Sequence, residues 1–288
     1  MQKKTKNLDY GAIRDELTEL IANNRLLLPG VPEAAHRVRQ AAMQADIDLA
    51  EVADLAAQDP PLAAHLIKIS NSVAIRGGHE IHNLRAAVTR LGARLTAVSA
   101  TSFAILQMVA MAPRHVDRLR ALYQHATEVG ERCYLHAHRY SHLSPEDALL
   151  TGLVHNIGTA VVLQYVRGKP RLQLPAVLEA LIEEVQATAG AELLRLWKFP
   201  SQISAAVASH EDWYRGKPAD APDYADLLIA AKAEIYQGTA HPLAALAKEP
   251  LPAFVRLQLD LSSPSAPPKL TEDAVTDMPA FFGLATAS

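Results

Sequence analysis

The sequence predicts an all-α protein with a two-lobed helical bundle. Alanine and leucine return at three- and four-residue steps, whereas strand-like alternation of β-branched residues is almost absent. Glycine is scarce, with 13 residues in a chain of 288. Because 49% of the residues are hydrophobic, the chain can fill a buried core, which excludes disorder throughout its length.

The first half of the chain carries apolar residues on single helical faces. Alanine and valine recur at positions 31, 34, 35, 38, 41 and 42, and Leu62, Leu66 and Ile69 follow the same spacing. Between them, Asp48 with Glu51 three residues later is typical of a capping box, so we expect a helix to start there.

Later helix boundaries carry other signals. Asn83 predicts the start of a short helix that ends at Gly92. Residues 144–147 combine a serine cap, a first-turn proline and two acids, which favour the positive end of a helix dipole. Pro222-Asp223 predicts a further helix start, and Gly238 its end.

One uncharged stretch, from Leu95 to Ala112, is long enough to span a membrane. It contains threonine, serine and glutamine, and much of the rest is alanine, so a helix buried in an all-α core explains it better. No apolar run follows the charged first ten residues, so we expect no export and no membrane contact. These features predict a soluble cytoplasmic protein.

Charge and cysteine content exclude several classes of protein. The 28 basic and 31 acidic side chains give a net charge of −3, so no nucleic-acid partner is predicted. The single cysteine, Cys133, excludes an internal disulfide framework and a multi-cysteine zinc site, and we interpret it as a packing residue.

The chain is predicted to have one main domain with two extensions. Residues 1–27 form an N-terminal helix or extension, and 28–240 form the domain, in lobes of about 28–112 and 115–240 that meet near Pro113. Residues 241–288 form a C-terminal extension with a proline- and serine-rich linker at 262–269. Its apolar end, 278–284, could dock on the body or on a second copy, so a homodimer stays open.

Three histidines differ from the other, scattered histidines because they lie within or next to predicted helices. His125 lies inside a helical pattern, His155-Asn156 is a polar pair within an otherwise apolar helix, and His210 follows an amphipathic run. A buried histidine must be hydrogen-bonded or ligated, so metal ligation and a structural hydrogen-bond network are both open at this point.

Five segments in order resemble the HDOD family, the regulatory relatives of HD-domain phosphohydrolases. The likeness runs from about residue 28 to 238 and implies a C-terminal lobe of HD type. The segments are LPGVP at 28–32, DPPL at 59–62 followed by ISNS at 69–72, the block at 81–92, LVHNIG at 153–158, and WKFP at 197–200 followed by His210-Glu211.

The resemblance also shows where this chain departs from a catalytic HD site, which binds divalent ions through histidines and aspartates. His125 and His155 match the two histidines, but Asn156 stands for the paired aspartate and Lys232 for the distant one. His210 is what remains of a double histidine.

A lysine ammonium in that position opposes metal binding. At about 4 Å from a divalent ion it would be repelled by roughly 8 kcal/mol at an effective dielectric of about 20. We therefore expect a vestigial pocket with no catalytic residue, no metal and no cofactor. In it, Lys232 would fill the vacated position and donate to Asn156 and to histidine nitrogens.

By resemblance, the chain is a non-catalytic regulatory or scaffold module of bacterial signal transduction, whose partners are other signalling proteins. Two alternatives remain: a metal-dependent HD-type phosphohydrolase of nucleotides or cyclic dinucleotides, and a binding module for a phosphorylated second messenger such as a cyclic dinucleotide. A polar loop with Arg76, His79 and His82 is a candidate ligand or partner surface, or a plain connection between helices.

Overall fold

The structure is a computed structural model that describes residues 8–23, 25–26, 33–44, 46–72, 75, 79–111, 114–217, 220–241, 244–245 and 249–259. Every regular element in these ranges is a helix, which confirms the predicted all-α class. The motif at 28–32, Arg76 and the C-terminal extension from residue 260 onward lie outside the described residues.

The chain divides into two compact units. The first unit contains the described residues of Met1–Leu28 and Val154–Pro264, so it is built from two separate stretches of chain, and the second contains those of Pro29–Leu153. This division differs from the lobes drawn on the sequence, because the helices on both sides of Pro113 share one unit.

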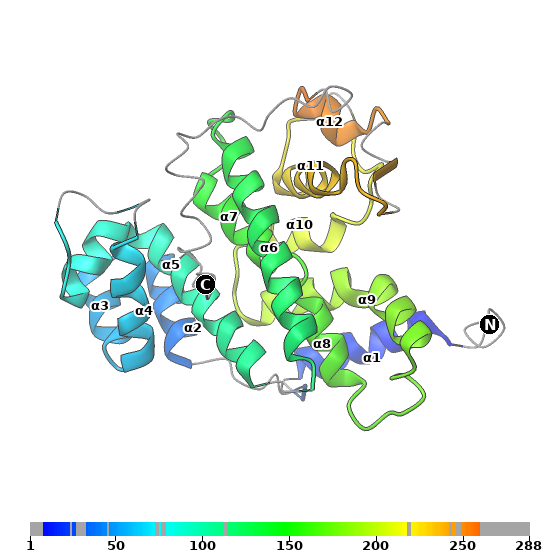
Figure 1. The fold of residues 1–288 in the computed structure, drawn as a ribbon, viewed down its shortest axis with the longest axis horizontal. Helices are drawn as coiled ribbons and strands as arrows, with labels where there is room; N and C mark the ends of the chain where they lie inside the picture. The colour runs from blue at the N-terminus through cyan, green and yellow to red at the C-terminus, as the bar shows by residue number, and fades with distance from the viewer. Residues whose placement is uncertain are drawn as a thin grey trace. The chain divides into compact units, whose positions relative to one another are not determined.

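In the first unit, the long helix α9 is the central element. Helices α1, α8 and α10 pack on α9, α11 packs on α10, and α12 packs on α11 (Figure 1). The bounds are α1 Tyr10–Ala22, α8 Gly158–Tyr165, α9 Pro175–Leu196, α10 Ser201–Ser209, α11 Tyr224–Tyr236 and α12 Pro252–Arg256. The hydroxyl of Tyr165 donates to Glu16 over 2.6 Å, which ties α8 to α1 across 149 positions of sequence.

In the second unit, helices α2, α3 and α4 pack on α5, and α6 follows α5 (Figure 1). The bounds are α2 Glu33–Ala42, α3 Leu49–Ala56, α4 Pro60–Ser70, α5 Leu84–Ala110, α6 Val116–Ala137 and α7 Pro145–Val154. In α6, Gly130 faces Gly152 of α7. A Cβ on Gly152 would lie 2.2 Å from Cα of Gly130, so these helices cross at backbone distance.

Several predicted helix starts are confirmed by their caps. The side chain of Asp48 accepts from the amide of Ala50 at 2.8 Å. Asn83 accepts from the amide of Ala86, also at 2.8 Å. Such caps satisfy amide groups that have no partner within the helix.

Gly92 interrupts α5, as the sequence predicts for the end of a short helix. Its φ of 68° and ψ of 176° lie in a region that only glycine occupies readily, and the helix resumes after it.

Replacing Gly92 by alanine is expected to lower the free energy of unfolding by about 1–3 kcal/mol, because alanine is strained at these dihedral angles. A Cβ there would have no atom within 4 Å, so the loss would come from backbone strain and not from a steric clash. Urea denaturation measures it. An unchanged midpoint would contradict the interrupted helix.

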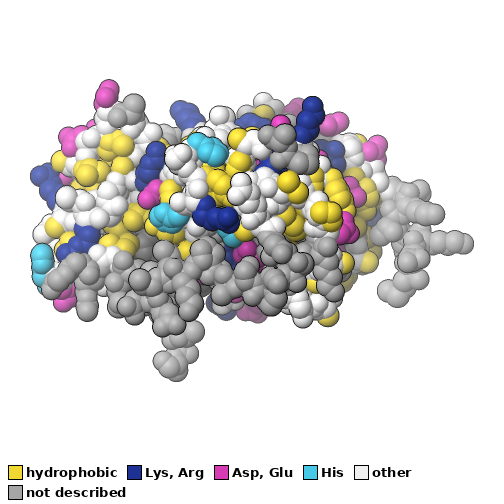
Figure 2. Space-filling view, turned by 90° about the horizontal axis from the view of Figure 1, so that it is seen from above, with side chains coloured by type: hydrophobic (Ala, Val, Ile, Leu, Met, Phe, Trp, Pro, Cys, Tyr) yellow, Lys and Arg dark blue, Asp and Glu magenta, His cyan; other side chains and the backbone are white. Residues whose placement is uncertain are grey.

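Two helical stretches are long and apolar enough to cross a membrane, Leu84–Ala110 and Pro145–Tyr165. In their most apolar windows, 67% and 83% of the residues are buried within the fold, as in the core helices of a soluble protein. On the face in Figure 2, basic side chains are dispersed among acidic and neutral ones.

Candidate functional site

Most residues of the predicted pocket lie in the first unit. His155 and Asn156 occupy the turn between α7 and α8, His210 caps the end of α10, and Lys232 lies in α11. His125 belongs to the second unit, where it is half-buried on α6.

The segment around His155 is a turn and not the continuous helix that its apolar sequence suggested. The amide of Ile157 donates to the carbonyl of Val154 at 3.1 Å, and that of Thr159 to the carbonyl of Asn156 at 3.0 Å. These bonds span three residues, which is tighter than the α-helical spacing. The turn leaves the His155 side chain in the interior, 2% exposed.

His210 lies beside His155 in the interior of the unit. The two rings meet edge to face, with 5.4 Å between their centroids, and His210 is fully buried. Its Nδ1 donates to the carbonyl of Val207 at 2.7 Å, which holds the ring against the last turn of α10. Its Nε2 lies 3.0 Å from Oε1 of Glu211, but it lacks the alignment of a hydrogen bond.

Glu211 carries the charge of the pocket together with Lys232. The ammonium of Lys232 donates to Oε1 of Glu211 over 2.8 Å, and the lysine is only 4% exposed. The same ammonium lies 5.1 Å from the ring centroid of Trp213, within the range of a cation–π contact. Lys232 is predicted in this pocket by the family resemblance, whereas its pairing with Glu211 is not predicted.

Burial is the largest influence on the three pKa values. It lowers the pKa of Lys232, against the opposing effect of Glu211, and together with the Lys232 charge it lowers the pKa of His210. Burial alone would raise the pKa of Glu211, but the contacts with His210 and Lys232 outweigh it and hold that pKa well below the usual range. The carboxylate of Glu211 is therefore ionised.

A second layer of hydrogen bonds links Glu211 to α8 and α9. Nε2 of Gln186 donates to Oε1 of Glu211 at 3.4 Å, and the hydroxyl of Thr159 donates to Oε1 of Gln186 at 2.8 Å. These hydrogen bonds require α8 and α9 to lie close together. The two helices do so at Gly158, where a Cβ would lie 1.9 Å from the carbonyl oxygen of Gln186.

The donor set of this pocket does not fit a divalent metal ion. Within the described ranges, no three His, Cys, Asp or Glu side chains are grouped so that they could hold one. The carboxylate that could serve as a ligand is already paired with an ammonium 2.8 Å away, and Asn156 offers no charge. A metal would have to displace or deprotonate Lys232, and both changes cost free energy.

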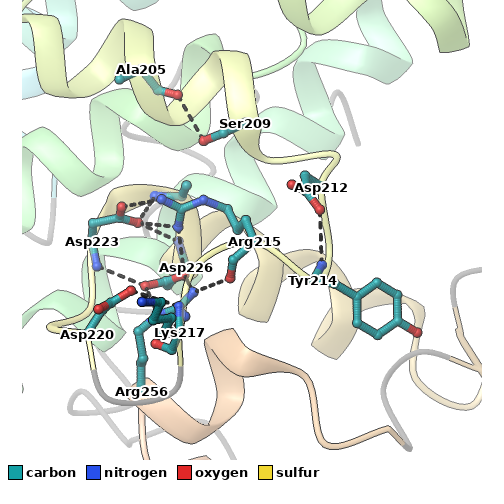
Figure 3. A network of polar contacts seen from close by, with 11 residues as sticks. Ala205, Ser209, Asp212, Tyr214, Arg215, Lys217, Asp220, Asp223, Asp226 and Arg256 are labelled. Carbon is teal, nitrogen blue, oxygen red and sulfur yellow. Dashed lines mark hydrogen bonds and ion pairs between the residues drawn. The ribbon is translucent and has the colours of Figure 1, made fainter.

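A network of four charged side chains holds the other end of α11 (Figure 3). Asp226 accepts from Nη1 of Arg215 at 2.8 Å and from Nε of Arg256 at 2.8 Å, and Arg256 also donates through Nη2 to the same carboxylate. Asp223 caps α11 and binds Arg215 at 2.6 Å. The network fixes α12 and the segment after Trp213 to α11, the helix that carries Lys232.

The candidate loop of the second unit is closed at its base. Asn71 donates to the carbonyl of Ile81 at 2.7 Å and accepts from its amide at 2.9 Å. Arg90 donates to the carbonyls of Ser70 and His79 at 3.2 and 3.0 Å. His79 and His82 are exposed.

Comparison with known proteins gives one family match and several structural neighbours. The HDOD domain profile matches residues 28–213. A protein of Shewanella amazonensis SB2B, provisionally named a metal-dependent phosphohydrolase, is 25% identical, with a TM-score of 0.67 over 95% of this chain and 99% of that one. No curated protein matches.

Two further neighbours share the fold. An HDOD domain protein with unknown function from Geobacter sulfurreducens is 18% identical, with a TM-score of 0.62 over 95% of this chain and 97% of that one. A protein of Marinobacter aquaeolei VT8, provisionally named a signal transduction protein, is 22% identical, with a TM-score of 0.60 over 96% of this chain and 67% of that one.

Proposed function

The chain belongs to the HDOD domain family, and from this membership we propose that it is a non-catalytic module of bacterial signal transduction that acts through contacts with other signalling proteins. We place it in the cytoplasm. The proposal gives the pocket of His155, His210, Glu211 and Lys232 a structural role. There, an internal ion pair takes the place that a metal ion has in catalytic relatives.

The contact between Lys232 and Glu211 carries this proposal. A phosphohydrolase of this fold needs an ion that polarises the phosphoryl oxygen and supplies hydroxide. Lys232 brings a positive charge to the carboxylate that would otherwise bind such an ion, and the two side chains neutralise each other. The pocket can therefore stabilise the fold without a bound ion.

The provisional name of the Shewanella neighbour favours the competing function, metal-dependent phosphohydrolysis. Turnover distinguishes the two functions. The purified full-length chain, incubated with Mn²⁺ and either p-nitrophenyl phosphate or a cyclic dinucleotide, is expected to hydrolyse neither above the protein-free rate. Hydrolysis that disappears in a His210→Ala variant of unchanged stability would establish the enzyme and overturn the proposal.

Restoring the two acids is expected to create a metal site. In the double variant Asn156→Asp/Lys232→Asp, affinity for Mn²⁺ should rise at least tenfold over the unmodified chain, because two carboxylates replace an amide and an ammonium. Titration calorimetry measures the affinity, and elemental analysis measures the metal retained on purification.

The matched control is Lys232→Met, which removes the charge but adds no ligand. It should bind Mn²⁺ no better than the unmodified chain. A full equivalent of metal in the unmodified chain, or no gain in the double variant, would contradict the role assigned to Lys232.

His155→Ala is expected to lower the free energy of unfolding by about 2 kcal/mol, because it removes a buried ring that packs against His210. Thermal and urea denaturation measure the loss. His82→Ala, at an exposed histidine, serves as the control and should stay within about 0.5 kcal/mol of the unmodified chain. Equal stabilities for the two variants would show that His155 is not part of the core.

A further inference from the structure

A groove lies between α4 and α5 of the second unit, and none of the pocket residues described above lines it. It has a volume of about 360 Å³, near the lower end of ligand pockets, so it suits a short apolar segment better than a nucleotide. Its lining is mostly apolar and includes no acidic residue. The lining residues are Pro61, Ala64, His65, Lys68, Phe103, Leu106, Gln107 and Ala110.

His65 provides this groove with a ring nitrogen, Nε2, that can accept a hydrogen bond but has no donor among the described residues. Its ring lies 5.5 Å from the ring of Phe103, centroid to centroid, and its Nε2 is buried with no hydrogen-bond partner among the described residues. Burial, and then the charge of Lys68, lower the pKa of His65 to about 4, against a backbone hydrogen bond with Ser99.

A neutral imidazole that uses one nitrogen as a donor presents the other as an acceptor. Because a buried acceptor without a partner costs free energy, the groove favours an occupant that brings an N–H group to Nε2 of His65.

Lys68 adds a positive charge to the groove. It is exposed, and no carboxylate lines the groove to balance it. The groove therefore selects a segment that joins apolar side chains, a free N–H group and a neighbouring acid.

The C-terminal end of this chain has that composition. Residues 260–288 lie outside the described residues, and within them 278–284 read Met-Pro-Ala-Phe-Phe-Gly-Leu. Three acids precede this apolar run, Glu272, Asp273 and Asp277. The two phenylalanines provide apolar anchors, and their backbone amides provide N–H donors.

We propose that residues 278–284 bind the groove between α4 and α5 of the same chain, with Asp277 beside Lys68 and a backbone N–H of the phenylalanine pair donating to Nε2 of His65. A tether of about 18 residues before Asp277 can extend to about 60 Å. Such a tether keeps the local concentration of the segment in the millimolar range, so modest contacts suffice. The bound tail would cover an apolar surface that is otherwise free to bind a partner.

Disulfide trapping in the full-length chain tests this contact. Ala64 is exposed in the groove, so Ala64→Cys combined with Ala280→Cys should form an intramolecular disulfide under mild oxidation, detected by mass spectrometry of proteolytic fragments. The matched control is Glu51→Cys with Ala280→Cys, because Glu51 is exposed on α3 and does not line the groove. We expect the groove pair to react at least tenfold faster. Native Cys133 is buried and stays in both variants.

Charge reversal provides a second readout. Adding Lys68→Glu to the groove pair should slow trapping about fivefold, and adding Asp277→Lys as well should restore the rate. Equal rates for the groove and control pairs would overturn the proposal. Disulfides formed only between chains would also overturn it, because they would place the tail of a second copy in the groove.

Discussion

A Gly158→Ala chain is expected to lose more than about 3 kcal/mol of folding free energy, a large share of the roughly 5–15 kcal/mol typical of a folded protein. The new Cβ would lie 1.9 Å from the carbonyl oxygen of Gln186 and 2.8 Å from the amide nitrogen of Gly190. Both are backbone atoms of α9, so relief requires α8 and α9 to separate. The hydrogen bond from Thr159 to Gln186 would be lost with that contact.

Urea denaturation of the purified variant, or its yield as soluble protein, measures this loss. Gly11→Ala is the matched control, because Gly11 is exposed in α1 and its Cβ would meet the side chain of Asp9 at 3.2 Å and no closer atom. We expect the control to change stability by less than about 1 kcal/mol. A Gly158→Ala chain as stable as the control would mean that α8 and α9 do not cross at backbone distance.

An Asp226→Asn chain is expected to lose about 3–5 kcal/mol, because the substitution leaves two arginines without their shared buried carboxylate. Asp226 has no exposed surface, and Arg256 is 6% exposed. Asparagine has a similar shape, but it removes the negative charge and one acceptor oxygen. Helix α12 would lose its ionic attachment to α11, so it should become the first segment to exchange its amide hydrogens.

The matched control is Asp54→Asn, which breaks the exposed ion pair between Arg85 and Asp54. Exposed pairs contribute little, so this variant should lose less than about 1 kcal/mol. Thermal unfolding of the two variants side by side gives the comparison. Equal losses would show that the network around Asp226 is solvated and not part of the core.

Local features of this fold could be predicted from sequence because they depend on neighbouring residues. Asp48, Asn83 and Asp223 cap helices as predicted, since a cap needs only a short polar side chain before a helical run. Gly92 interrupts its helix for an equally local reason, its positive φ. The end of helix α7 just before His155 could not be predicted from neighbouring residues, because these residues are apolar and favour a continuous helix.

The partners in the pocket depend on contacts between helices. Lys232 was assigned to the pocket by resemblance, but its bond to Glu211 joins the end of α10 to α11, and only the packing of these helices sets that distance. The one sequence feature that could have indicated Glu211 as a pocket residue is its position directly after His210. Nothing local pointed to Gln186, which reaches Glu211 from α9, or to Arg256, which reaches Asp226 from 30 positions away.

The interleaved course of the chain has a consequence for its biosynthesis. Helix α1 leaves the ribosome before the helix it packs on, α9, which follows about 150 residues later, a delay of roughly 8–30 seconds at ordinary elongation rates. A helix as short as α1 is marginal alone, so Ile13, Leu17 and Ile21 stay without their burial site while the second unit is being made. The second unit can fold first as an uninterrupted stretch. The first unit can complete its folding only when α9 has left the ribosome. Until then, the apolar residues of α1 are a target for chaperones.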